Sequence, residues 1–141
     1  IDVESSIHVG ARGPTNDRGV FNHTRDVGYG LIDGTELFNV GLRNTAKNIV
    51  ESLKGRSVYL CFDMDFFDPS CAPGVCTPTW GGATSREGLD FLQNLSGLNL
   101  VGADINTVSP PHDISGMTAF LAATVGLEIL SLICHSKGLV E

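Results

Sequence analysis

Residues 58–65 read Val58-Tyr59-Leu60-Cys61-Phe62-Asp63-Met64-Asp65, and this stretch decides the fold. Its first five residues are apolar without interruption and of types that favour β-structure. An unbroken apolar run, as opposed to an alternating one, is typical of a parallel strand that helices cover on both faces. We therefore expect a buried parallel strand that ends at a pair of carboxylates.

The two carboxylates at the end of this strand carry the first functional signal. Asp63 and Asp65 are two residues apart, so their side chains leave a strand on the same face. Burying two like charges side by side costs on the order of several kcal/mol each unless a cation offsets them. A divalent metal with hard oxygen ligands would do so. The spacing alone leaves a second interpretation open, in which the strand end is solvated in a loop.

Further elements can be assigned on both sides of this strand. The pattern predicts a strand at 6–9, a long polar surface loop at 13–34, an amphipathic helix over 42–53, a helix that begins with a capping box at 84–87, a buried strand at 98–105, and a last helix from residue 115 or 116. Strands that alternate with helices indicate right-handed crossovers and a three-layer α/β/α fold with a central parallel sheet. Ligands of such sheets bind beyond the carboxyl ends of the strands, where we expect Asp63 and Asp104.

The composition indicates one soluble globular domain over residues 1–141, with 42% hydrophobic and 18% charged residues. A net charge of −7 without a Lys/Arg cluster argues against nucleic acid or an anionic membrane as a partner. No basic-then-apolar leader opens the chain, and the apolar run at 117–134 is interrupted by polar residues, which favours a buried helix over a membrane span. The four cysteines lack the paired spacing of a zinc site, so we expect reduced thiols in a cytoplasmic protein.

The residues that follow the strand resemble a known family. Asp63-Met64-Asp65 is followed by Asp68-Pro69, by Ala72-Pro73-Gly74 and by Gly81-Gly82, and this series resembles the signature of the ureohydrolases, the arginase and agmatinase family. Residues 9–13, 102–113 and 116–119 resemble further blocks of the same family. The resemblance runs from about residue 7 to residue 132, and it implies that the chain is the C-terminal half of an arginase-type fold.

This resemblance implies a metal-dependent hydrolase that cleaves a guanidino C–N bond and releases urea. Asp63 would bridge two divalent metals, and Asp65 would be a ligand to one of them. The metals of the family are usually manganese, with nickel in one branch, and they activate a water molecule that attacks the guanidinium carbon. Family members are usually trimers or hexamers, so we expect a homo-oligomer that binds a small cationic guanidino substrate.

Other parts of the family's site lie outside the region matched by this chain. The usual family protein is much longer, and its remaining metal-ligand blocks and catalytic His lie upstream. Because the catalytic His of the family lies upstream, we expect no catalytic residue in this chain. Two carboxylates cannot hold a stable binuclear site, so we also expect no activity from the chain alone. The resemblance also suggests that Asp68 orders the loop, that Arg12 braces the sheet edge, and that Cys61, where the family has Ser, is a buried packing residue.

Substrate recognition is where the sequence departs from the family. The glutamate that pairs with the substrate guanidinium aligns with Thr107, so a strong bidentate contact is lost. The candidate substrate-binding residues are Thr107, Trp80 and His112. Trp80 would either stack on a planar guanidinium or pack under its loop, and His112 would either bind substrate or hold structure.

Three functions remain open at this point. The first is hydrolysis of agmatine-like guanidinoalkyl substrates, which are the usual substrates of the family. Thr107 and Trp80 instead resemble the branch that hydrolyses free guanidine to urea and ammonia. The third alternative is a non-catalytic paralogue that acts as an oligomer scaffold.

Overall fold

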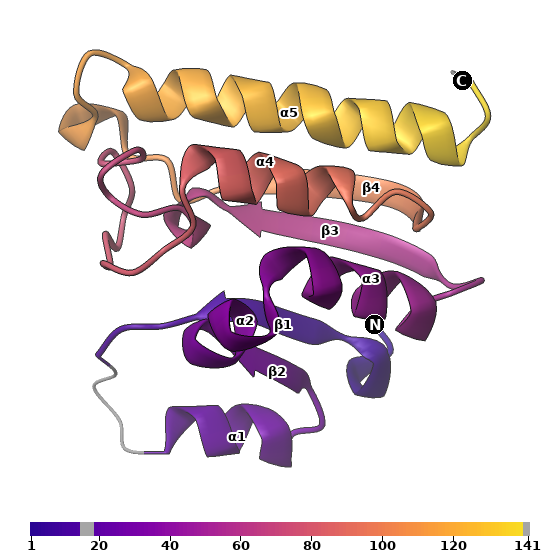
Figure 1. Ribbon diagram of the computed structural model, residues 1–141. Coiled ribbons are helices and arrows are strands. Elements are labelled where there is room, and N and C mark those ends of the chain that lie inside the picture. The colour runs from indigo at the N-terminus through magenta and orange to yellow at the C-terminus, as the bar shows by residue number, and fades with distance from the viewer. Residues whose placement is uncertain (15–18, 140–141) are drawn as a thin grey trace.

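The computed structural model describes residues 1–14 and 19–139 as an α/β chain with two pairs of parallel strands (Figure 1). The strands are β1 (Ile7–Ala11), β2 (Gly30–Asp33), β3 (Ser57–Asp63) and β4 (Asn99–Asn106); the helices are α1 (Val20–Asp26), α2 (Gly34–Val40), α3 (Leu42–Ser52), α4 (Ser85–Gln93) and α5 (Met117–Ser136); single 3-10 turns are η1 (Val3–Ser5), η2 (Met64–Phe66) and η3 (Pro110–His112). β1 pairs with β2, and β3 pairs with β4, both in parallel. The arrows of β1 and β3 point the same way in Figure 1, so both pairs place their carboxyl ends at one edge. The expected parallel α/β class is confirmed.

The expected surface loop at 13–34 is wrong for most of its length. Helix α1 and strand β2 both lie within it, while residues 15–18 fall outside the described part of the chain. α1 has 7 residues and buries no side chain fully, and β2 has only 4 residues. Elements this short repeat the helical or strand period too few times for a sequence pattern to reveal them.

Two consecutive helices connect the strand pairs. α3 confirms the helix expected over 42–53, whereas α2 was not expected. The side chain of Asp33 caps α2 by accepting a hydrogen bond from the N–H of Glu36 at 2.9 Å. Gly41 separates the two helices with φ of 87°, a conformation that a residue without Cβ adopts at low steric cost.

β3 and β4 form the longer pair and confirm both expected strands. Ser57 lies opposite Asn99 at one end, and Asp63 lies opposite Asn106 at the other. Helix α4 connects these strands and begins with the expected capping box. The Thr84 hydroxyl accepts from the N–H of Glu87 at 3.2 Å, while the Thr84 N–H donates to the Glu87 carboxylate at 2.9 Å.

Helices cover only one face of this pair, so the expected burial on both faces is wrong for the chain. Phe62 and Leu100 are buried in the core. Tyr59 and Val101, in contrast, are 61% and 56% exposed. In the described part of the chain no helix packs on the face that carries Tyr59. One face of the apolar strand β3 is therefore exposed.

Helix α5 is likewise buried on one side only. Val125 and Ile129 are buried, and the helix packs against β4 and α4. Phe120 and Leu127 point outward with 78% and 69% exposure. The expected burial of this helix is therefore wrong for its outer side, on which no described element lies. By length and composition α5 would pass as a membrane span, but a core helix of a soluble protein passes the same test, so this is weak evidence.

Aromatic packing anchors the segment that follows β3. Phe67 is fully buried, and its ring lies 5.7 Å from that of Phe62 and 6.0 Å from that of Phe66. Phe66 also contacts Phe91 of α4, with ring centroids 5.6 Å apart. Rings at these separations pack favourably in the core. The start of the β3–α4 segment (residues 64–84) is thus fixed to the hydrophobic core.

Hydrogen bonds fasten the β3–α4 segment to the end of β4 and the start of α5. The N–H of Gly74 donates to Thr118 Oγ1 at 2.8 Å, and Thr118 is fully buried. The N–H of Cys76 donates to the carbonyl of Thr107 at 2.9 Å, and that of Ser109 donates to the carbonyl of Gly74 at 2.8 Å. The loops at this edge therefore form one connected structure.

Replacing Thr118 by valine should lower the free energy of unfolding by about 1–3 kcal/mol, because the buried N–H of Gly74 would lose its acceptor. Thr124→Val on the same helix is the matched control: that hydroxyl only donates to the carbonyl of Phe120 on an exposed side. Its effect should stay within about 0.5 kcal/mol. Urea unfolding of both variants measures the difference, and equal losses would contradict the buried bond.

Candidate functional site

Asp63 and Asp65 lie together at the carboxyl end of β3. Asp63 is the last residue of that strand, and Asp65 lies in the turn η2 that follows directly. Both line one end of an elongated cavity of about 910 Å³ between β1 and β3, which we term the interstrand groove. Every residue of β1 and β3 lines this groove. The structure therefore places the predicted carboxylate pair where a parallel fold exposes ligand-binding groups.

The electrostatic environment of Asp63 disfavours its negative charge. Burial raises the pKa of Asp63 above its ordinary value, and the charges of Asp65 and Asp104 raise it further. A bound cation would reverse both effects, because it stabilises the ionised carboxylate. This end of the groove is therefore suited to a positively charged ligand.

Asp65 is oriented by contacts to its side chain and to its backbone. The Thr77 hydroxyl donates to Asp65 Oδ2 at 2.6 Å. The Asp65 N–H donates to Thr107 Oγ1 at 3.2 Å. The Asp65 carbonyl accepts from Arg12 Nη2 at 2.6 Å. With side chain, N–H and carbonyl all engaged, the direction of the carboxylate is fixed before any ligand binds.

Arg12 joins the end of β1 to the β3–α4 segment. Its Nη2 donates to three backbone carbonyls, those of Asp65 at 2.6 Å, Phe67 at 3.0 Å and Thr79 at 2.8 Å. Burial lowers the pKa of Arg12, whereas the charges of Asp65 and Asp68 act in the opposite direction. The expected bracing role is confirmed, and its target is the backbone of the segment that holds the carboxylates.

Asp68 orders the same segment, as expected. Its Oδ2 accepts from the N–H groups of Gly81 and Gly82 at 2.9 and 3.2 Å, and its Oδ1 accepts from the N–H of Ser70 at 2.9 Å. The hydrogen bond of the Ser70 side chain, followed by that of the Ser70 N–H and those of the Gly81 and Gly82 N–H groups, lowers the pKa of Asp68 to about 2, although burial acts in the opposite direction. The Cβ that a larger residue would place at Gly82 would come within 2.6 Å of the Asp68 nitrogen, so this turn requires glycine.

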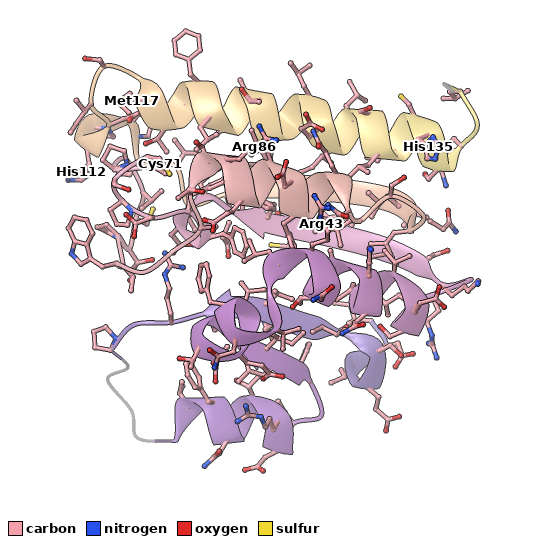
Figure 2. The ribbon with its side chains drawn as sticks, in the orientation of Figure 1. Arg43, Cys71, Arg86, His112, Met117 and His135 are labelled. Carbon is pink, nitrogen blue, oxygen red and sulfur yellow. The ribbon has the colours of Figure 1, made fainter. Side chains whose placement is uncertain are left out.

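The three candidate substrate residues do not lie together at the groove. Thr107 is half-buried, and its hydroxyl contacts the backbone of Asp65. Trp80 is 76% exposed on its loop. His112 lies in η3 with its Nδ1 2.8 Å from Ser109 Oγ, at the end of the molecule where α5 begins (Figure 2). None of these three is among the described residues that line the groove.

Thr107 adopts a backbone conformation that is rare for its residue type. Its φ is 67°, in the left-handed region that disfavours β-branched side chains. Such conformations cost about 1–3 kcal/mol and persist where surrounding contacts enforce them, often at functional sites. Here the hydroxyl contact to Asp65 and the carbonyl contact to Cys76 hold it. The residue positions the carboxylate segment, a role that sequence analysis did not identify.

Asp104 and Cys61 lie differently from expectation. Asp104 is inside β4, opposite Cys61, and not at the strand end. Its carboxylate accepts from the Tyr59 hydroxyl at 2.7 Å and from Asn106 Nδ2 at 2.6 Å. Cys61 is exposed on the same face, which contradicts its expected burial; no helix among the described residues covers that face. All four cysteines are free thiols, as expected.

Two contacts at this site had no usable sequence signal. Thr77 reaches Asp65 across 12 residues, and Arg12 reaches it across 53. Neither separation corresponds to a helical or strand period. The position of Thr77 inside the signature block was the only hint, since that block was already assigned to the site.

The carboxylate pair fits part of a metal-binding set. Carboxylate oxygens are the hard donors that manganese and magnesium prefer, and nickel accepts them together with nitrogen ligands. No cluster of three or more His, Cys, Asp or Glu side chains suited to a metal ion occurs among residues 1–14 and 19–139. Asp63 and Asp65 can therefore serve as two ligands of a site that needs others from elsewhere.

Comparison with known proteins gives consistent matches over nearly the whole chain. A family model described as "Arginase family" matches residues 1–131. The guanidinobutyrase of Pseudomonas aeruginosa is 33% identical over 141 residues, which cover 100% of this chain and 43% of that protein. The agmatinase of Photorhabdus laumondii is 36% identical and is matched over 97% of this chain and 42% of its own length. The solved structure of proclavaminate amidino hydrolase from Streptomyces clavuligerus superimposes with a TM-score of 0.87 at 34% identity, covering 96% of this chain and 44% of that chain.

The stability of the chain should depend on Asp68 at low pH. The pKa of its carboxyl group is lowered from 3.8 to about 2, so its contribution is complete above 3.8 and is lost as pH falls towards 2. Asp68→Asn keeps an acceptor oxygen but cannot titrate. Urea unfolding between these pH values should show a steeper loss for the wild type than for the variant. Identical slopes would mean that the Asp68 carboxylate is not held by Ser70 and the two glycine N–H groups.

The conformation of Thr107 predicts an unusual order of stability among variants. Thr107→Ala and Thr107→Gly both remove the acceptor of the Asp65 N–H, but only glycine relieves the positive φ. The glycine variant should therefore be more stable than the alanine variant by about 1 kcal/mol. Chemical denaturation compares the two directly. An alanine variant as stable as the glycine variant would contradict the left-handed conformation.

Proposed function

The chain belongs to the arginase family, and on that premise we propose that the whole protein is a metal-dependent hydrolase that cleaves a guanidino C–N bond and releases urea. The chain spans about two fifths of the length of the curated relatives it matches. Those relatives are named for guanidinobutyrate and agmatine hydrolysis, and the Streptomyces structure for amidino hydrolysis. These names refer to a guanidino compound, to agmatine and to amidino hydrolysis, which supports the reaction class.

The observation that carries the proposal is the carboxylate pair at the carboxyl end of β3. Asp63 and Asp65 line the same end of the interstrand groove, and burial together with like charge raises the pKa of Asp63. A pair that serves only structure would be expected to bond to cationic partners. The charge of Arg12 interacts with that of Asp65, but its guanidinium bonds to the backbone carbonyl, and among the described residues neither carboxylate takes part in a salt bridge. The pair is better explained as an incomplete cation site.

Divalent metals bound at this pair would polarise a water molecule and stabilise the charge that develops in the reaction. Asp63 and Asp65 would hold them. Thr77 and Thr107 keep the Asp65 carboxylate and backbone in place, and Arg12 fixes the segment to β1. Such prior orientation lowers the reorganisation that the site needs when ligands bind. Manganese is the favoured metal and nickel the alternative.

The nature of the substrate depends on how Thr107 is used. Its hydroxyl already accepts from the Asp65 N–H, and a hydroxyl has a second acceptor lone pair that a guanidinium N–H can use. That single contact is weaker and less directional than a bidentate carboxylate pair. A guanidinoalkyl compound would therefore need further recognition from the rest of the protein, whereas free guanidine would need less. The net charge of −7 favours a cationic substrate in both cases.

The full-length protein, loaded with manganese or nickel, should release urea from at least one of agmatine, 4-guanidinobutyrate, arginine and free guanidine. Asp63→Asn and Asp65→Asn should each lower kcat/KM by at least about 100-fold, because each removes a charged metal ligand. Colorimetric urea detection together with metal analysis provides the measurement. The 141-residue chain alone should release none.

Asp90→Asn is the matched control for these variants. Asp90 lies in α4 and forms an ion pair with the exposed Arg86 at 3.2 Å, away from the carboxylate pair, so activity should stay close to that of the wild type. Turnover of guanidine alone would assign the small-substrate branch. Bound metal without urea from any compound would favour the non-catalytic scaffold and contradict the proposed reaction.

A further inference from the structure

The end of β4 brings an uncharged oxygen donor next to the carboxylate pair. Asn106 is the last residue of β4 and lies opposite Asp63 in the parallel register. Neighbouring strands of a sheet are about 4.8 Å apart, so side chains at these two positions can reach one small ligand. The next residue, Thr107, bonds to the backbone of Asp65. The end of β4 is therefore held at the same place as both carboxylates.

The side chain of Asn106 projects to the same face of the strand pair as that of Asp63. Cys61 and Asp63 are two residues apart in β3, so both side chains point to one face. Asn106 Nδ2 lies 3.4 Å from Cys61 Sγ, which places the carboxamide on this face. In the described chain β3 pairs with β4 on one side and borders the interstrand groove on the other. Asn106 thus flanks Asp63 on the side away from the groove.

Asp104 determines which way the carboxamide of Asn106 points. Asn106 Nδ2 donates to Asp104 Oδ1 at 2.6 Å, and Asp104 Oδ2 accepts from the Tyr59 hydroxyl at 2.7 Å. The reverse orientation would place the carboxamide oxygen against an ionised carboxylate, which can only accept hydrogen bonds. Both contacts of Nδ2, to Asp104 and to Cys61, lie towards the amino ends of the strands. The oxygen Oδ1 therefore faces the carboxyl end.

The oxygen of this carboxamide is available to a ligand. Asn106 is exposed, and the described residues bond to its side chain only through Nδ2. The carboxylate of Asp104 at the nitrogen polarises the amide group, because hydrogen-bonded groups polarise one another. This makes Oδ1 a stronger electron donor. Carbonyl oxygens, like carboxylates, suit hard divalent cations such as manganese.

The charges around Asn106 favour a neutral ligand at this position. Burial raises the pKa of Asp63, and the charges of Asp65 and Asp104 raise it further. Another carboxylate opposite Asp63 would add to this repulsion in the metal-free protein. A carboxamide adds an oxygen ligand without adding a charge.

We propose that Asn106 Oδ1 is a third protein oxygen ligand of the divalent metal site, beside Asp63 and Asp65, and that Asp104 is the positioning residue that orients it. This inference rests on the proposed function, because it concerns the same metal site. It extends that site from the end of β3 to the end of β4.

Manganese binding to the full-length protein tests the role of Asn106. Asn106→Ala should weaken manganese affinity by about tenfold or more, measured by competition with a chelator, because one oxygen ligand is lost. Asn99→Ala is the matched control. Asn99 is exposed at the other end of β4, where it contacts Ser57 and Lys137, so affinity should stay within about twofold. Equal affinities of the wild type and Asn106→Ala would overturn the proposal.

Asn106→Asp separates a metal ligand from an amide that serves only structure. This variant keeps an oxygen at the position but cannot donate to Asp104 when ionised. It should bind manganese at least as tightly as the wild type, to within about twofold. A loss as large as that of Asn106→Ala would mean that the N–H donor matters and the oxygen does not, which would overturn the proposal.

Crystals of the full-length protein grown with manganese provide the direct readout. An anomalous peak within direct coordination distance of Asn106 Oδ1 is expected. A peak that Asp63 and Asp65 hold out of contact with Oδ1 would overturn this inference alone. A wild-type protein that binds no manganese or nickel would overturn both this inference and the proposed function.

Discussion

The hydrogen bonds of one nitrogen, Nη2 of Arg12, connect the first strand pair to the segment that carries the candidate metal ligands. That atom contacts the carbonyls of Asp65, Phe67 and Thr79, and so ties the end of β1 to the segment after β3. The strands themselves do not provide this link, because β1 and β3 belong to separate pairs in the described chain. The two hydrogens of Nη2 are shared among these three carbonyls, and a hydrogen bond that involves a charged group is worth about 1.5–3 kcal/mol. Without these bonds the carboxylate segment would keep its aromatic anchor, including the packing of Phe66 over Gly10 of β1, but would lose its polar link to the first strand pair.

The chemistry of the site follows from that fixed segment. The backbone N–H, the backbone carbonyl and the carboxylate of Asp65 all take part in hydrogen bonds. These bonds hold the Asp65 carboxylate at the end of the interstrand groove that Asp63 also lines. Burial raises the pKa of Asp63, and the nearby charges of Asp65 and Asp104 raise it further. The strained backbone of Thr107 is part of the same arrangement. Backbone strain and charge repulsion of this kind persist at functional sites. A metal ion at this edge of the sheet would offset the repulsion between the carboxylates.

Much of this could be predicted from the sequence, and the failures have physical reasons. The strands at β3 and β4, helix α3 and the capping box of α4 were predictable because apolar periodicity and caps are local signals. Helix α1 and strand β2 were too short to show a period. The exposure of Tyr59 and Cys61 could not be foreseen. An unbroken apolar run indicates that a strand is covered in the complete protein, and this chain is only part of the fold. The contacts of Arg12 and Thr77 arise only when distant segments meet.

The central claim is that Asp63 and Asp65 hold divalent metal in the complete protein. An anomalous-difference map from crystals of the full-length protein grown with manganese tests it most directly. The account predicts peaks within direct coordination distance of both carboxylates, at the end of β3, with Asp65 still bonded to Thr77. Strong peaks elsewhere, or none at these carboxylates in a protein shown to contain manganese, would contradict it.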